Sequence, residues 1–342
     1  MDKVFFEKIE QAAGLDNVKY NENMSTHTTF RTGGPATVMV TPNDEETLKE
    51  IIRICKENNE PYYVIGKGSN LLVADKGIDL VVIKIYHTMD EVLFHNNTTN
   101  SLMDEQQGDA SQKDAKQSNG QDAVTEDDVS QDKVLVSAGA GIMLSKLAKE
   151  LLDRELGGFE FASGIPGTLG GAITMNAGAY GGQMEDVVKT VYAIDEEGNE
   201  YTLSNEEMQF GYRHSLIMDK KLIVTKVDME FAHCEYNEIK KKMDEFNGLR
   251  REKQPLEHPS AGSTFKRPEG YFAGKLVQDA GLAGYRVGGA CVSPKHCGFV
   301  VNDENGTSDD VMQVMKHVDE VVYDRFGVHL EPEVRIIGEW KV

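Results

Sequence analysis

The chain has 342 residues, of which 57 are acidic and 36 are basic, so its formal net charge is −21. This length predicts two or three domains, and the 39% of hydrophobic residues is enough to build their cores. So large an excess of acid argues against nucleic acid or an anionic membrane as a partner, and no apolar run approaches the roughly 20 residues of a membrane span.

Residues 1–95 predict a first small lobe. The first 25 residues carry charges throughout and lack the apolar core of a signal peptide, so we expect a soluble, cytoplasmic protein. A helix is predicted to begin at Asn43, where Glu46 completes a capping box and apolar residues follow at helical spacing. Short apolar runs bounded by turn residues predict strands at 37–40, 62–65, 71–73 and 79–85.

Residues 96–132 concentrate the acidity of the chain. They contain nine acidic residues and two lysines, no aromatic residue and almost no apolar periodicity. Such a segment buries too little apolar surface to offset the entropy of ordering it, so we interpret it as a disordered surface loop without a catalytic role. Strand-like segments stand on both sides of it, which indicates that the loop interrupts a folded domain.

The rest of the chain predicts a second lobe over residues 133–232 and a separate domain over residues 233–342. The second lobe combines predicted strands at 134–138, 187–194, 200–203 and 222–231 with a helix at 144–152. The last domain combines helices at 235–252 and 308–326 with strands at 287–292 and 298–301. This mixed order predicts an α+β fold. The four cysteines are irregularly spaced, which predicts neither a disulfide framework nor a metal site.

Glycine-rich turns follow several of the predicted strands. They lie at 66–70, 139–141 and 164–171, and the last leads into the sequence NAGAYG at 176–181. Glycines let a backbone approach a ligand closely and direct its N–H groups toward a pyrophosphate. No Walker A motif or G-x-S-x-G elbow occurs, and Leu71 and Leu144 stand where a Rossmann turn needs its third glycine. The turns therefore favour a dinucleotide held between two small α+β lobes.

Five motifs in order give the chain a resemblance to a known family. They are GKGSNLLV (66–73), SGIPGTLGGAITMNAGAYGG (163–182), FGYRHS (210–215), AGSTFKRP (261–268) and LEPEVRIIG (330–338). Together they resemble the UDP-N-acetylenolpyruvoylglucosamine reductase family of peptidoglycan precursor synthesis. The resemblance implies a two-lobed FAD-binding domain of the p-cresol methylhydroxylase (vanillyl-alcohol oxidase) type, followed by a carboxy-terminal α+β substrate-binding domain.

The resemblance also implies a reaction and the residues that perform it. A hydride passes from NADPH to non-covalently bound FAD and then to the β-carbon of an enolpyruvyl ether, which leaves an enolate that needs positive charge and a proton. Ser263 matches the proton donor of the family, and Arg213 matches the arginine that stabilises the enolate. Glu333 matches the acid that partners this arginine. It lies two residues from Glu331, so both face one side of an extended strand.

Binding residues are implied in the same way. Tyr180 matches an aromatic residue of the substrate pocket, and Arg250 and Lys253 resemble basic residues that reach diphosphates. The residues expected to bind FAD are Gly66, Gly68, Ser69, Asn70, Gly164, Gly167, Gly170, Gly171, Gly178 and Arg335. We expect small-molecule partners only, NADPH and a UDP-sugar, and a monomer.

Two features depart from the family pattern, and two other functions stay open. Arg267 stands where some members carry Asn, and residues 231–260 leave no room for the tyrosine-bearing loop that covers the substrate in one subtype.

A sugar or alcohol oxidase could use the same flavin fold, although no His or Cys lies in the glycine motifs to attach FAD covalently. A non-catalytic nucleotide-sugar binder would not need Ser263, Arg213 and Glu333 together.

Overall fold

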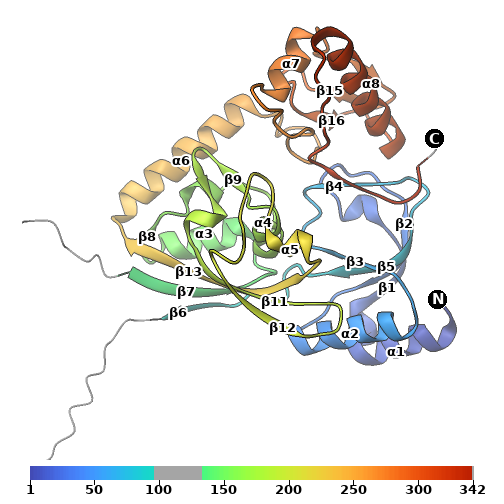
Figure 1. The fold of residues 1–342 in the computed structure, drawn as a ribbon, viewed down its shortest axis with the longest axis vertical. Coiled ribbons are helices and arrows are strands. Elements are labelled where there is room, and N and C mark those ends of the chain that lie inside the picture. Colours follow the sequence, from blue (N-terminus) through green and yellow to red (C-terminus); the bar gives the residue numbers. More distant parts are fainter. Residues whose placement is uncertain (96–132, 341–342) are drawn as a thin grey trace, which may run out of the picture.

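A computed structural model describes residues 1–95 and 133–340, so the acidic segment 96–132 lies outside the described residues. The first lobe is a four-stranded sheet with mixed strand directions, covered on one side by two helices (Figure 1). In pairing order, its strands are β1 (Val18–Asn23), β2 (Pro35–Val40), β5 (Ile78–Lys84) and β3 (Tyr62–Ile65). The helices α1 (Lys3–Ala13) and α2 (Glu45–Glu57) bury apolar side chains against it. Neither α1 nor β1 was predicted.

The second lobe is an antiparallel sheet, six-stranded within the described residues. In pairing order, its strands are β12 (Glu200–Ser204), β11 (Val188–Ile194), β13 (Ile223–His233), β7 (Lys133–Gly139) and β6 (Val92–His95), and β8 (Leu156–Gly157) pairs with β13. The accompanying elements are α3 (Leu144–Leu152), α4 (Leu169–Thr174), the hairpin of β9 (Gly178–Ala179) and β10 (Gly182–Gln183), and α5 (Leu216–Asp219). One apolar core runs through both lobes, so the lobes pack as one unit.

The long helix α6 (Tyr236–Lys253) leads from β13 toward the carboxy-terminal domain (Figure 1). This domain has a second apolar core, which also includes Phe30 and Leu72 of the first lobe. Its elements are α7 (Ala273–Asp279), β14 (Arg286–Val287), β15 (Ala290–Val292), β16 (Val300–Asn302) and α8 (Ser308–Phe326). The chain then returns to the first lobe, where β17 (Arg335–Ile337) pairs in parallel with β4 (Leu71–Val73). This return places the last sequence motif beside the first glycine turn.

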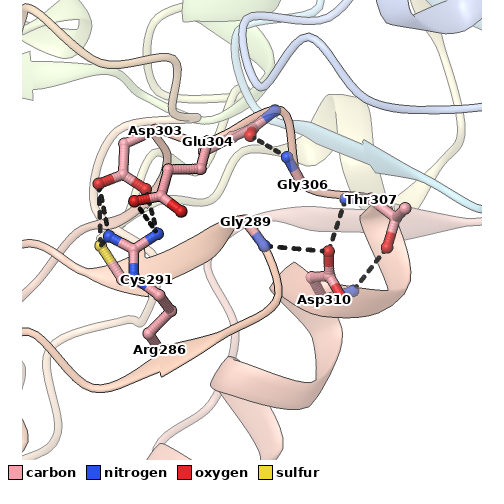
Figure 2. A network of polar contacts seen from close by, with 9 residues as sticks. Arg286, Gly289, Cys291, Asp303, Glu304, Gly306, Thr307 and Asp310 are labelled. Atoms are coloured by element: carbon pink, nitrogen blue, oxygen red, sulfur yellow. Dashed lines mark hydrogen bonds and ion pairs between the residues drawn. The ribbon is translucent and has the colours of Figure 1, made fainter.

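The predicted single strand at 287–292 is wrong, because a tight turn divides it into β14 and β15. Gly288 has φ +51°, and the backbone of Gly289 passes so close to Gly306 that a Cβ there would lie 2.3 Å from its nitrogen. The Asp310 carboxylate accepts hydrogen bonds from the N–H groups of Gly289 and Thr307, which joins this turn to the start of α8 (Figure 2). The strand is therefore interrupted because the turn between β14 and β15 packs against the start of α8.

Other predicted elements differ in how well they match. The helices predicted at 144–152 and 308–326 are confirmed to the residue. The helix predicted to begin at Asn43 instead has Asp44 as its N-cap, because the Asp44 carboxylate accepts the N–H of Thr47 at 2.8 Å. Both residue types favour this position, and only the backbone geometry selects between them.

Candidate active site

Two glycine turns that lie about a hundred residues apart in the sequence meet between the lobes. The first follows β3 at residues 66–70, and the second, at residues 164–171, runs into the first turn of α4. A Cβ on Gly66 would lie 2.2 Å from the Thr168 hydroxyl, and a Cβ on Gly167 would lie 3.3 Å from Ser69 Oγ. Glycine at these positions thus allows the backbone of each turn to approach a side-chain hydroxyl of the other turn.

The centre of the first turn leaves no space for a side chain. Gly68 has φ +73°, and a Cβ there would lie 1.9 Å from the carbonyl oxygen of His27. The Gly68 carbonyl in turn accepts the N–H of Thr29 at 3.1 Å. Residues 27–29 therefore form a backing layer behind the turn, which no sequence motif had suggested.

The turns line two adjoining cavities of about 930 and 200 Å³. The larger volume lies within the usual range of ligand-binding sites. Of the residues expected to bind FAD, those that line one or both cavities are Gly66, Gly68, Ser69, Asn70, Gly167, Gly170, Gly171 and Arg335. Gly164 and Gly178 line neither cavity: Gly164 packs against Asn247 and Arg250 of α6, and Gly178 lies in the β9–β10 hairpin.

The three expected catalytic residues line a third cavity, of about 500 Å³. The Arg213 Nε donates to Glu333 Oε1 at 2.7 Å, and the Glu333 side chain is only 9% exposed. Ser263 lines the same cavity. The fold therefore brings together side chains from three distant motifs: a guanidinium, a carboxylate and a hydroxyl.

Arg213 lies on a short turn that is anchored to the second glycine segment. Its backbone has φ +56°, and Gly211 and His214 pair across the turn. The buried Asn176 donates to the Gly211 carbonyl at 3.2 Å. Ser215, also buried, donates from Oγ to the carbonyl of Thr174 at 2.8 Å. The arginine is thus held by the chain segment that follows α4.

Ser263 and Glu333 lie on neighbouring extended segments. The buried Thr264 donates its N–H to the Gly298 carbonyl and accepts the N–H of Val300 with its hydroxyl, each at 2.8 Å. Its carbonyl accepts the Glu333 N–H at 2.8 Å. The serine and the glutamate therefore share one rigid support.

The two glutamates of the last motif have different surroundings. Glu331 is 74% exposed and pairs with Lys266 at 3.0 Å, whereas Glu333 pairs with Arg213 inside the cavity. The motif had indicated Glu333 as the reacting residue, and of the two glutamates only Glu333 lines the cavity of Ser263.

Asn70 connects the glycine turns to the catalytic residues. Its side-chain amide donates to the Glu333 carbonyl at 3.1 Å, and its own carbonyl accepts the N–H of Arg335 at 3.0 Å. Sequence reasoning had assigned Asn70 only to cofactor binding. Because it also holds the backbone of Glu333, it fixes the distance between the two sites.

Tyr180 and Arg250 form a separate group on α6 and the β9–β10 hairpin. Tyr180 stacks on Phe246 with centroids 4.8 Å apart, and the Arg250 guanidinium lies 5.3 Å from the Tyr180 ring. Arg250 is 7% exposed, and its buried Nε has no hydrogen-bond partner among the described residues. Burial lowers the pKa of Arg250. Lys253 is exposed, and none of these three expected binding residues lines the three cavities.

Comparisons with known proteins decide the family. A model of the carboxy-terminal domain of UDP-N-acetylenolpyruvoylglucosamine reductase matches residues 254–337, and a model of an FAD-binding domain matches residues 36–102 and 122–204. The reductase of Caldanaerobacter subterraneus subsp. tengcongensis is 43% identical over 339 residues, which cover 99% of this chain and 100% of that protein. The reductase of Alkaliphilus oremlandii is 44% identical over 340 residues, with the same coverage. The chain belongs to the UDP-N-acetylenolpyruvoylglucosamine reductase family.

A solved reductase has the same fold. The crystal structure of UDP-N-acetylenolpyruvylglucosamine reductase from Thermus caldophilus matches 93% of this chain and 98% of its own, with a TM-score of 0.69 and 29% identity. The predicted fold class, an α+β FAD-binding domain followed by an α+β carboxy-terminal domain, is confirmed. The protein is thus a flavin-dependent oxidoreductase. The two adjoining cavities lined by the glycine turns fit FAD, because glycine lets the backbone approach a bound cofactor closely.

Within residues 1–95 and 133–340, no helix is long and apolar enough to cross a membrane. The same residues include no group of three or more His, Cys, Asp or Glu side chains that could hold a metal ion.

Proposed function

We propose that this member of the reductase family reduces UDP-N-acetylglucosamine enolpyruvate to UDP-N-acetylmuramate with NADPH, as a cytoplasmic monomer in peptidoglycan precursor synthesis. One observation carries the proposal most directly. The Arg213–Glu333 pair and Ser263 line one cavity, and Asn70 joins that cavity to the glycine turns. A nucleotide-sugar binder without catalysis would not need this combination.

FAD, when bound by the glycine turns and Arg335, supplies the hydride chemistry of the reaction. The residues of the chain meet the charge that develops on the substrate. As hydride reaches the β-carbon, electrons collect at the α-carbon, and the Arg213 guanidinium stabilises the resulting enolate and carboxylate. Glu333 holds that guanidinium in place at 2.7 Å. This pairing lets a partly exposed arginine present a fixed charge to the substrate.

Ser263 completes the reaction as the proton donor. Its Oγ–H bond breaks as a C–H bond forms at the α-carbon, and the serine then recovers a proton from solvent. A serine hydroxyl is a weak acid, but an enolate is basic enough to accept its proton in a cavity from which substrate excludes water. The hydrogen bonds of Thr264 keep this hydroxyl beside Arg213 and Glu333.

For the substrate diphosphate we propose the Tyr180–Arg250 group, with Lys253 at the exposed end of α6. Arg250 supports this choice because it is buried without any carboxylate partner among the described residues. A guanidinium in such a setting is stabilised by an anion, and a diphosphate offers one. Arg250 lies next to Gly164, whose missing side chain leaves room for it.

Anaerobic spectroscopy of the purified holoenzyme tests the proposed function. NADPH should bleach the flavin absorbance, and UDP-N-acetylglucosamine enolpyruvate should restore it without oxygen. Recovery only after air is admitted would favour an oxidase instead. Protein that binds the UDP-sugar but takes up no FAD would favour a nucleotide-sugar binder.

A further inference from the structure

The larger of the two cavities lined by the glycine turns has a second, outer end between the lobes. Gly66 and Gly170 line this cavity, and so do Lys56 of α2 and Glu196 of the β11–β12 hairpin. All four residues of β3, from Tyr62 onward, line it as well and span about 13 Å at about 3.3 Å per residue. Burial, and then the charge of Glu196, raise the pKa of Tyr62 to about 12, so the hairpin lies near the start of β3.

Two ion pairs join the lobes at this outer end. Figure 1 shows the tip of the β11–β12 hairpin, residues 195–199, beside α2. Lys56 of α2 pairs with Glu197 of the hairpin tip, and Lys49 Nζ lies 2.6 Å from Oε1 of Glu200, where β12 begins. The side chains of Lys56 and Glu197 are about half exposed, so their pair faces solvent. We call these two contacts the cross-lobe pairs.

The hairpin tip is rigid within itself but weakly fastened to α2. The Asp195 carboxylate accepts the N–H groups of Glu197 and Asn199, each at 2.9 Å, so the tip can move as a unit. The cross-lobe pairs lie at the surface, where ion pairs are weak and are screened by salt. Lys49 also pairs with two glutamates of its own helix, so it keeps partners when the tip moves away.

A cofactor held between the lobes exchanges only if part of the cavity wall moves. One apolar core runs through both lobes, so separating the lobes would expose that core to water. Moving the hairpin tip breaks weak surface pairs instead. We propose that the hairpin tip is a gate for FAD, which enters and leaves at the outer end of the cavity when the cross-lobe pairs open.

A gate has a kinetic signature that a binding residue lacks. The cross-lobe pairs close the cavity with or without FAD, so weakening them speeds association and dissociation by the same factor and leaves the Kd for FAD unchanged. A residue that holds the bound cofactor changes the Kd instead. The proposal depends on FAD binding and not on which substrate the flavin reduces.

Exchange of FAD in the holoenzyme provides the test. The double variant Glu197→Gln with Glu200→Gln removes both cross-lobe pairs, and neither glutamate lines the cavity. Displacement of bound FAD by isotopically labelled FAD should become about fivefold faster, the scale of two exposed ion pairs, while the Kd measured by flavin fluorescence stays nearly unchanged. Electrostatic attraction alone predicts the opposite, because removing negative charge slows the release of an anionic cofactor.

Glu196→Gln is the matched control, because Glu196 carries the same charge on the same hairpin tip and pairs with neither Lys49 nor Lys56. It should not speed release. Salt gives a second measurement: about 1 M NaCl, where the Debye length is about 3 Å, should speed release from the wild type more than from the double variant. Unchanged release in the double variant, equally fast release in Glu196→Gln, a Kd that rises with the rate, or the same salt response in both proteins would overturn the proposal.

Discussion

At the scale of single residues, the proposed proton-donor role of Ser263 can be separated from any role in binding FAD. Ser263 lines the cavity of Arg213 and Glu333 but neither of the cavities formed by the glycine turns. Its hydroxyl is therefore expected to matter only after the flavin has been reduced.

Ser263→Ala should retain flavin reduction by NADPH and lose the reoxidation by UDP-sugar by at least about a hundredfold, the usual scale for removal of a general acid. Stopped-flow absorbance measures each half-reaction separately. Thr264→Ser, which keeps the hydroxyl that accepts the Val300 N–H, is the control and should change neither rate strongly. Equal losses in both half-reactions of Ser263→Ala would disprove the assignment.

A second residue-scale feature is a hydrogen-bonded chain behind the first glycine turn. Lys84 Nζ donates to His27 Nδ1 at 2.7 Å, so the imidazole proton lies on Nε2, which donates to Glu22 at 2.8 Å. Burial lowers the pKa of His27 below its ordinary 6.5, and the nearby charge of Lys84 lowers it further against the opposing effect of Glu22. Lys19 contributes a smaller effect in the same direction as Lys84. His27 is therefore held in its neutral form.

This chain predicts a pH dependence of stability. Below pH 6.5 the unfolded chain protonates this histidine and the folded chain does not, so the free energy of unfolding falls as the pH falls toward the folded-state pKa. The slope approaches about 1.4 kcal/mol per pH unit for one full proton. His27→Gln, which can still donate and accept, should flatten this part of the curve in urea titrations. An unchanged slope would show that other groups dominate.

At the scale of elements, the first glycine turn depends on a close approach that no substitution can preserve. Gly68 combines φ +73° with contact against the His27 carbonyl, so a methyl group there would push the turn away from residues 27–29. A displaced turn also moves Asn70, and with it the backbone of Glu333.

Gly68→Ala should therefore lose most of its bound FAD, measured as flavin absorbance per mole of purified protein. Gly198→Ala is the matched control, because Gly198 has φ +80° but no atom within 4 Å of the position that its new methyl group would occupy. Gly198→Ala should lower the free energy of unfolding by about 1 kcal/mol, the intrinsic strain of the left-handed backbone, and should keep its FAD. Similar FAD contents in the two variants would refute a steric requirement at Gly68.

Elements also show where pattern reading succeeds. The helices 144–152 and 308–326 were predicted because their apolar residues repeat with helical period, and those residues are buried. The hairpin turn between β14 and β15 was missed, since Gly288 is needed for packing against Asp310 and Gly289 for packing against Gly306. The period of apolar residues shows which face of a helix is buried. It does not show which segments from elsewhere in the chain pack against a turn.

At the scale of the whole molecule, polar contacts join the carboxy-terminal domain to the first lobe in addition to the β17–β4 pairing and a shared apolar cluster. The Asp75 carboxylate accepts the N–H groups of Ser308 and Asp309 at 2.9 and 2.8 Å and so satisfies the start of α8. Asn302 donates to the carbonyl of Phe30 at 2.9 Å. These contacts help to hold Ser263 and the glycine turns, which lie in different domains, in a fixed relation.

Asp75→Ala should lower the free energy of unfolding by about 1 kcal/mol, as expected when a helix loses its capping acceptor, and should loosen the domain contact. Unfolding followed by both flavin fluorescence and circular dichroism should then give two separate transitions in place of one. Asp79→Ala is the control, because Asp79 bonds to Thr37 within the first lobe. Coincident transitions in Asp75→Ala would show that the contact does not couple the domains.

The sequence by itself determined the family, the α+β class and the residue types of the site, because five motifs and the glycine turns are local features of the chain. It could not show that Gly164 packs on Arg250, that Asn70 supports Glu333, or that Arg267 lies between Tyr212 and Phe272. Those relations join segments that are mostly tens to hundreds of residues apart. Only the tertiary structure decides them, because side-chain and backbone contacts depend on packing in space and not on spacing along the chain.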